Sequence, residues 1–211
     1  MTLPISLLLV LLAPPYFVQA TSSQRSPFPG SVKSAEVESE LEGLTGKGAY
    51  DLGLRYYKDR KYAEAVQAFE ASTKLDSNNP DPYYALGLSY LVLYQTRSAQ
   101  ASFRKAIQLA PDWIEPHLRL GWLMTQDPSA EEDAALHFAQ HLVSQWPRSA
   151  EGHCLLGMAY FQKDKNEEAV SEYSKAIEIN PGYADAYSKL GWLYSNWRKY
   201  DLAVKIVEEG F

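Results

Sequence analysis

Residues 80–113 read PDPYYALGLSYLVLYQTRSAQASFRKAIQLAPDW, and the pattern in this stretch decides the fold. A leucine precedes Gly87, a tyrosine follows three residues later, Ala99 comes twelve residues after the glycine, and Phe103 comes four residues after the alanine. The same order of residues recurs along the chain at intervals of 34, 34, 36 and 34 residues, and the longer interval reflects a two-residue insertion around Asp127-Pro128. The recurring glycines are Gly53, Gly87, Gly121, Gly157 and Gly191.

Each repeat consists of two halves that carry apolar residues at intervals of three and four, the period of an amphipathic helix. Neither half contains a proline beyond its first turn, so each half can form an uninterrupted helix. We expect the glycine of the first helix to lie where the second helix approaches closely, opposite the small alanine of that second helix. Because a single hairpin leaves one apolar side uncovered, consecutive hairpins must stack into a solenoid whose first helices line its concave side.

This 34-residue pattern of Leu-Gly-x-x-Tyr, Ala-x-x-x-Phe and a closing proline resembles the tetratricopeptide repeat. The resemblance implies an all-α fold, an α-solenoid of about five helix-turn-helix repeats that forms a right-handed superhelix. The chain departs from the family where a large aromatic residue is usual, with Ala49, His117 and His153 near the start of three repeats and Ala139 in the second helix of the third. We expect looser packing at these positions. The expected repeats span residues 46–79, 80–113, 114–149, 150–183 and 184–211, the last of them incomplete.

The composition excludes several classes of function. The 211 residues carry 20 Lys and Arg against 26 Asp and Glu, a formal net charge of −6, so a broad cationic surface for nucleic acid is not expected. The single cysteine, Cys154, excludes a framework of intramolecular disulfides. His137 and His141 are four residues apart without a third ligand, and Cys154 directly follows His153 in a geometry that does not make a dyad. We therefore expect no enzymatic activity, no catalytic residue, no cofactor and no metal.

The first twenty residues differ from the rest of the chain. An apolar stretch from Leu3 to Ala13 is followed by two prolines and by Val18-Gln19-Ala20, which is typical of a secretory signal peptide cleaved after Ala20. The apolar stretch is shorter than the roughly 20 residues that a membrane-spanning helix needs. We expect an exported protein, periplasmic or secreted, without a stable membrane span after cleavage; an uncleaved membrane anchor is the alternative. Residues 21–45 are expected to form a linker with a short helix between Ser34 and Leu44.

The tetratricopeptide resemblance places ligands in the concave groove of the first helices. The residues that directly follow the repeat glycines are all large and apolar in this chain, where the family often has polar residues. Covering one tryptophan removes roughly 200 Å² from water at about 25 cal/mol/Å², far more than an exposed ion pair contributes. We therefore predict that this apolar groove binds a peptide or a partner helix. The predicted groove residues are Leu54, Tyr57, Tyr84, Leu88, Leu91, Arg119, Trp122, Met158, Phe161, Lys189 and Trp192.

Two other interpretations of these residues remain open, since the same side chains can be covered by the N-terminal segment or a second copy, or can pack between repeats. The subclass of the family that binds chaperone tails is disfavoured, because of its expected basic and amide residues only Arg119 is present. The predicted function is an exported scaffold for protein–protein interaction. The alternative is the N-terminal repeat portion of a longer multidomain protein or enzyme. The last repeat stops inside its second helix, so self-association through an uncapped C-terminal repeat is also expected to be open to the chain.

Overall fold

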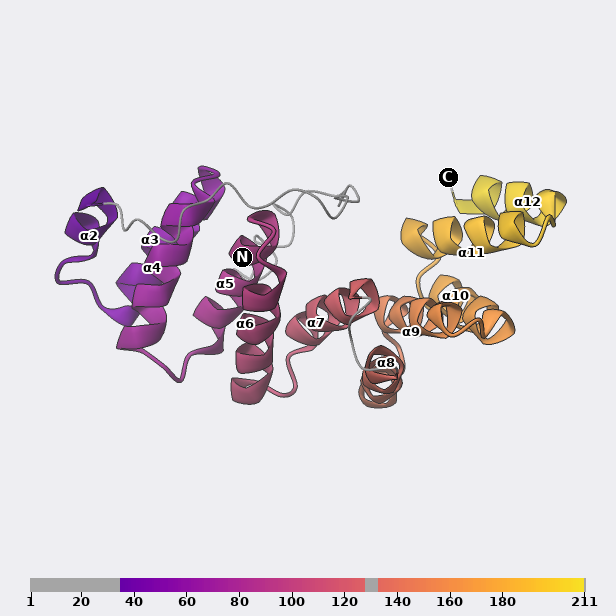
Figure 1. Cartoon of the computed structure of the whole chain (residues 1–211), viewed down its shortest axis with the longest axis horizontal. Coiled ribbons are helices and arrows are strands. Elements are labelled where there is room, and N and C mark those ends of the chain that lie inside the picture. Colours follow the sequence, from indigo (N-terminus) through magenta and orange to yellow (C-terminus); the bar gives the residue numbers. More distant parts are fainter. Residues whose placement is uncertain (1–34, 128–132, 211) are drawn as a thin grey trace. The chain divides into compact units, whose positions relative to one another are not determined.

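The computed structural model describes residues 35–127 and 133–210, and these residues form eleven α-helices and no strand (Figure 1). The predicted signal peptide lies outside the described residues, as does most of the predicted linker. The helices are α2 (Ala35–Leu41), α3 (Gly46–Lys58), α4 (Tyr62–Leu75), α5 (Pro80–Val92), α6 (Thr96–Leu109), α7 (Ile114–Gln126), α8 (Ala134–Gln145), α9 (Ala150–Gln162), α10 (Asn166–Ile179), α11 (Ala184–Asn196) and α12 (Tyr200–Gly210).

The chain divides between Trp113 and Ile114 into two compact units, each described here by itself. Unit 1 contains the hairpins α3–α4 and α5–α6, and unit 2 contains α7–α8, α9–α10 and α11–α12. Within each unit the second helix of one hairpin packs on the next hairpin, as α4 does on α5 and α10 does on α11. This stacking of hairpins confirms the predicted all-α solenoid of tetratricopeptide-like repeats.

In the first four repeats the glycine admits an aromatic ring, so the expected contact between small residues is wrong there; in the fifth, a Cβ on Gly191 would lie near Val207 and 3.6 Å from the carbonyl oxygen of Ala203. A Cβ atom added to Gly87 would overlap the ring of Phe103, and one added to Gly157 would lie 2.6 Å from Cε1 of Tyr173. Both rings are buried, and they come from the position four residues after the repeat alanine. The glycine therefore makes room for the largest side chain of the second helix, and the repeat alanine fills a different part of the core.

In the third hairpin, the ring that packs near the repeat glycine comes from the residue before the usual position. Ala139 is buried at the position where α4, α6 and α10 place the ring, and Phe138 supplies a ring instead. A Cβ on Gly121 would lie 3.2 Å from Cε1 of Phe138 and 3.1 Å from Cδ1 of Leu155. The expected loss of packing at Ala139 is thus offset within the same turn of α8.

Four of the first helices, α3, α5, α9 and α11, are followed by a left-handed residue that is not glycine. Arg60, Tyr94, Asp164 and Arg198 have φ between 56° and 61° and occupy the same position of their repeats. In each case the next N–H donates to a carbonyl five residues earlier, as Lys61 N does to the Tyr56 oxygen at 2.9 Å. This is the Schellman arrangement, which satisfies the last carbonyls of the helix and turns the chain into the second helix.

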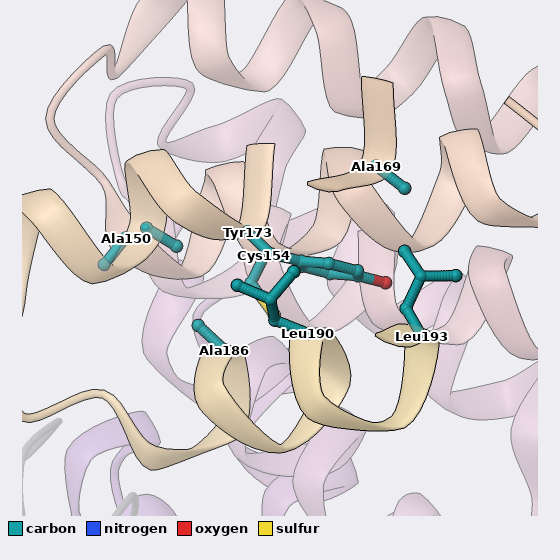
Figure 2. Packing of buried hydrophobic residues seen from close by; sticks show 8 residues of the cluster. Ala150, Cys154, Ala169, Tyr173, Ala186, Leu190 and Leu193 are labelled. Carbon is teal, nitrogen blue, oxygen red and sulfur yellow. The ribbon is translucent and has the colours of Figure 1, made fainter. Parts of the chain in front are cut away.

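The core of unit 2 forms where three helices meet. Figure 2 shows the side chains of Cys154 from α9, Tyr173 from α10 and Leu190 from α11 gathered between these helices. Small residues such as Ala169 and Ala186 belong to the same buried cluster and let the helices approach closely. The cluster fixes the positions of the first helices α9 and α11, which carry several of the predicted groove residues.

Candidate functional site

Three of the predicted groove residues in unit 1 are part of the protein core. The side chains of Tyr57, Tyr84 and Leu88 are buried. The Tyr57 ring packs edge-on against Tyr62 at 5.2 Å, and the Tyr84 ring lies 4.7 Å from that of Trp113. In this structure these side chains hold the hairpins together and do not offer a surface to a partner.

Leu54 and Leu91 follow the same spacing in unit 1 but remain half-buried. They belong to α3 and α5, and neither reaches the exposure of the large apolar side chains on the protein surface. Unit 1 therefore presents only narrow apolar strips at the predicted positions. Among the predicted groove residues, the exposed apolar side chain is that of Trp192 in unit 2.

Unit 2 presents an aromatic pair formed by the half-buried Phe161 of α9 and the exposed Trp192 of α11. The Trp192 side chain is 52% exposed, and its ring meets that of Phe161 edge-on with 5.0 Å between the centroids. Phe161 and Met158 are half-buried and pack against the core cluster of this unit. The cluster therefore fixes the position of the Phe161 ring that Trp192 contacts. Lys189 is exposed one turn before Trp192 on the same helix. Trp192 is thus held in place by Phe161 while part of its ring stays accessible to a partner, as expected of an aromatic residue that anchors a binding site.

Trp122 and Arg119 lie on α7, the first helix of unit 2, and both are half-buried. The C-terminal end of α7 is fixed to α9, because the Gln162 side-chain amide donates to the backbone carbonyl of Thr125, three residues after Trp122. Thr125 is itself buried. This bond fixes α7 relative to α9, the helix that carries Met158 and Phe161.

The buried thiol of Cys154 is not a reactive group. Burial, together with the nearby Asp185 carboxylate, raises the pKa of Cys154 to about 12. Because only the thiolate is an effective nucleophile, the side chain stays protonated and inert at neutral pH. Cys154 therefore serves as an apolar core residue in contact with the Tyr173 cluster.

The fourth repeat contains a buried polar network of His153, Glu172 and Lys175 that the sequence did not predict. The Nδ1 atom of His153 lies 2.6 Å from Oε2 of Glu172, and its Nε2 atom donates to the carbonyl of Pro147 at 3.1 Å. The Lys175 ammonium donates to the other oxygen of Glu172 at 2.7 Å. A carbonyl can only accept, so the Nε2 atom of His153 is the donor in its bond to Pro147. His153 is thus buried and hydrogen-bonded through both ring nitrogens, at a position where looser packing was expected.

The signal for this network was present but weak. Glu172 stands fifteen residues after the repeat glycine, where other repeats have Ala68, Ser102 and Ile206. An acidic residue at an otherwise small or apolar position indicates a buried partner. In the third repeat the equivalent histidine, His117, stacks on Phe138 at 6.3 Å.

The described residues lack a group of three His, Cys, Asp or Glu side chains that could hold a metal ion. His137 and His141 are both exposed on α8. Among the helices that the structure describes, none combines the length and apolar composition required to span a bilayer.

Comparison with known proteins identifies the repeats. A family model described as TPR repeat matches residues 53–93 and 157–196, and one described as Tetratricopeptide repeat matches residues 80–112 and 184–211. The mitochondrial import receptor subunit TOM70 of Homo sapiens is 25% identical over 174 residues, which is 80% of this chain and 28% of the receptor. The chain thus spans less than a third of this relative's length.

Solved structures of similar fold include MamA, with a TM-score of 0.64 and 25% identity over 75% of this chain and 92% of MamA. YrrB, described as a TPR protein with an unusual peptide-binding site, has a TM-score of 0.61 and 20% identity over 84% of this chain and 91% of YrrB. These likenesses agree with the stacked hairpins of units 1 and 2.

Proposed function

Because the chain is built of tetratricopeptide repeats, a scaffold typical of protein–protein interaction, we propose that it is an exported protein that binds a peptide or a partner helix through the aromatic pair of unit 2. The proposal rests on one observation above all, the 52% exposed Trp192 held edge-on against Phe161. A solved protein of the same fold, YrrB, is described as having a peptide-binding site. The partner is expected to place an apolar side chain on the indole.

The charges around the pair would set the direction of the partner. Lys189 is exposed one turn before Trp192, while Asp185 is exposed one turn earlier still. Exposed ion pairs contribute up to about 1 kcal/mol each, so they orient a bound chain more than they hold it. The apolar contact supplies most of the affinity, since burying a tryptophan removes roughly 200 Å² from water.

Replacing Trp192 with alanine is expected to weaken the capture of a partner by at least about tenfold without lowering the melting temperature. The ring is half-exposed, so its loss removes little from the core. The measurement is affinity capture from the exported compartment, followed by titration of the recovered partner, with melting monitored by circular dichroism.

Leu75 provides a matched control, because its side chain is 57% exposed at the end of α4 in unit 1. Leu75→Ala removes a similar exposed apolar group and should leave capture unchanged. Recovery of the same proteins in the same amounts by the Trp192→Ala chain would show that the aromatic pair is not the binding site.

The second part of the proposal is export, and it is based on the signal-peptide pattern of residues 1–20. Expression of the full chain in a secreting host should yield a product that begins at Thr21, as N-terminal sequencing would detect. Val18→Asp, which places a charge in the small-residue segment before the cleavage position, should retain the uncleaved chain. An uncleaved chain extracted only by detergent would instead support the membrane-anchored alternative.

A further inference from the structure

Acidic residues recur on the first helices of unit 2 at one fixed position of the repeat, six residues before the repeat glycine. These acids, which we call the acidic row, are Glu115 of α7, Glu151 of α9 and Asp185 of α11. Each stands seven residues before the apolar residue that follows the glycine, as Asp185 does before Trp192. Seven residues of helix make about two turns and about 10 Å, so the acid and the apolar residue lie on the same side of their helix.

The helix dipole alone does not account for the acidic row. A carboxylate is favoured anywhere in the first turn of a helix, and the second helices of unit 2 keep no fixed pattern there. The first turn of α8 has no acidic residue, that of α10 has two and that of α12 has one. The recurrence at one position of the first helices instead aligns these carboxylates with the predicted groove residues.

Glu151 and Asp185 lie near the same buried thiol, on neighbouring first helices. Burial raises the pKa of Cys154 to about 12, and the carboxylates of Asp185 and Glu151 both add to this rise. The Lys189 ammonium opposes it. Both carboxylates are exposed, and among the described residues neither has a hydrogen-bond or ion-pair partner. Lys189 stands one turn after Asp185, but α9 has the buried Leu155 at that place, so Glu151 has no cation one turn later on its own helix.

The distribution of charge along the sequence is a second, independent observation. Residues 114–211 contain nine Lys and Arg against fifteen Asp and Glu, a formal net charge of −6, whereas residues 1–113 contain eleven of each. All of the net charge of the chain therefore falls in the part that carries the aromatic pair. An acidic surface attracts basic partners and repels acidic ones.

We propose that the partner of the aromatic pair is an amphipathic helix whose apolar face is bordered by Lys or Arg side chains, and that Glu151 and Asp185 select it. This inference rests on the proposed function, because it names the partner of that same site. A helix is about 10–12 Å wide with its side chains, which matches the distance between the acidic row and the apolar residues. Its apolar face can therefore cover Trp192 while its basic edge lies over the two carboxylates.

Binding of three labelled synthetic peptides to the full chain tests this preference. The peptides share one helical design with a leucine face and carry lysine, glutamine or glutamate along one edge of that face. In fluorescence anisotropy at low salt, the lysine peptide should bind at least about tenfold more tightly than the glutamine peptide, and the glutamate peptide should bind most weakly. The advantage of lysine should shrink as salt rises to about 0.5 M, because exposed charges are then screened.

Variants locate the preference on the acidic row. Glu151→Gln/Asp185→Asn should remove the advantage of the lysine peptide and leave the affinity for the glutamine peptide unchanged. Glu167→Gln/Glu168→Gln is the matched control, because it removes two exposed carboxylates from the first turn of α10 and changes the net charge equally. Circular dichroism of each variant should show unchanged helicity. Equal loss of the advantage in both variants would mean that net charge alone attracts the peptide, and it would overturn the proposal.

The Trp192→Ala chain separates this inference from the proposed function. If the wild-type chain binds all three peptides equally and Trp192→Ala binds none, the aromatic pair is the site but the preference for a basic partner is wrong. If Trp192→Ala binds the peptides as tightly as the wild-type chain does, the proposed site itself is wrong. Absence of binding of all three peptides to the wild-type chain would likewise overturn the proposal.

Discussion

Replacing Phe103 with alanine should lower the free energy of unfolding by about 4 kcal/mol, because the ring is fully buried and truncation of such a ring leaves a cavity. The lost contacts include the Tyr84 ring, whose centroid lies 5.7 Å away, and the helix surface at Gly87. Urea denaturation followed by far-ultraviolet circular dichroism measures the change.

Gly87→Ala should reverse its effect between the two backgrounds. In the wild-type chain the new Cβ overlaps the Phe103 ring, and overpacking of this kind costs about 1–3 kcal/mol. In the Phe103→Ala chain the space is free, and alanine should stabilise the helix by about 1 kcal/mol over glycine. The control is Gly48→Ala, because a Cβ there meets its nearest atoms at an ordinary 3.4 Å. Equal effects of Gly87→Ala in both backgrounds would refute the contact between glycine and ring.

The sequence period was sufficient to predict the hairpins but not which residues meet inside them. Counting small residues paired Gly87 with Ala99, whereas in the structure Phe103 fills the space above the glycine. The spacing of residues gives the face on which a side chain lies and says little about its direction or reach. The Phe103 ring is long enough to extend from α6 to Gly87 on α5, although the spacing of small residues had paired this glycine with Ala99, one turn earlier on α6.

The sequence also did not predict which residue adopts the left-handed conformation at the end of the first helices. Glycine is the usual signal for the left-handed residue of a Schellman motif, yet Arg60, Tyr94 and Asp164 occupy that place here. Two backbone hydrogen bonds within each turn, such as those from the N–H groups of Arg60 and Lys61, offset the strain of the positive φ. A search for glycine after each helix would therefore miss all of these Schellman turns.

Candidate groove residues could be chosen by spacing, but their accessibility could not be predicted. Leu88 and Trp192 follow the same rule of position after the repeat glycine, and one is buried while the other is half-exposed. The difference depends on which neighbouring side chains cover each position, and that depends on packing between helices distant in sequence. Among the predicted apolar positions, the structure leaves Trp192 exposed, whereas Leu54 and Leu91 are half-buried.

Replacing Glu172 with alanine is expected to lower the free energy of unfolding by about 3 kcal/mol, although the residue lies far from the aromatic pair in sequence. Its carboxylate is buried and accepts from both His153 and Lys175. Removing it leaves the buried Nδ1 atom of His153 without its hydrogen-bond partner, and a buried polar group without a partner costs more than the bond contributed. Glu172→Gln keeps one acceptor and should lose less, as urea denaturation of the three chains would measure.

The fifth repeat supplies the matched replacement for the whole network. At the positions of His153 and Glu172 it carries Tyr187 and Ile206, so the double variant His153→Tyr/Glu172→Ile copies a pair that the chain already packs. Because an apolar pair of fitting shape avoids burying charge, this double variant should be within about 1 kcal/mol of the wild-type chain. Lys175→Ala should also cost less than about 1 kcal/mol, since the ammonium is half-exposed. A double variant as unstable as Glu172→Ala alone would mean that the network itself, and not the burial of a polar group without a partner, determines the stability of this repeat.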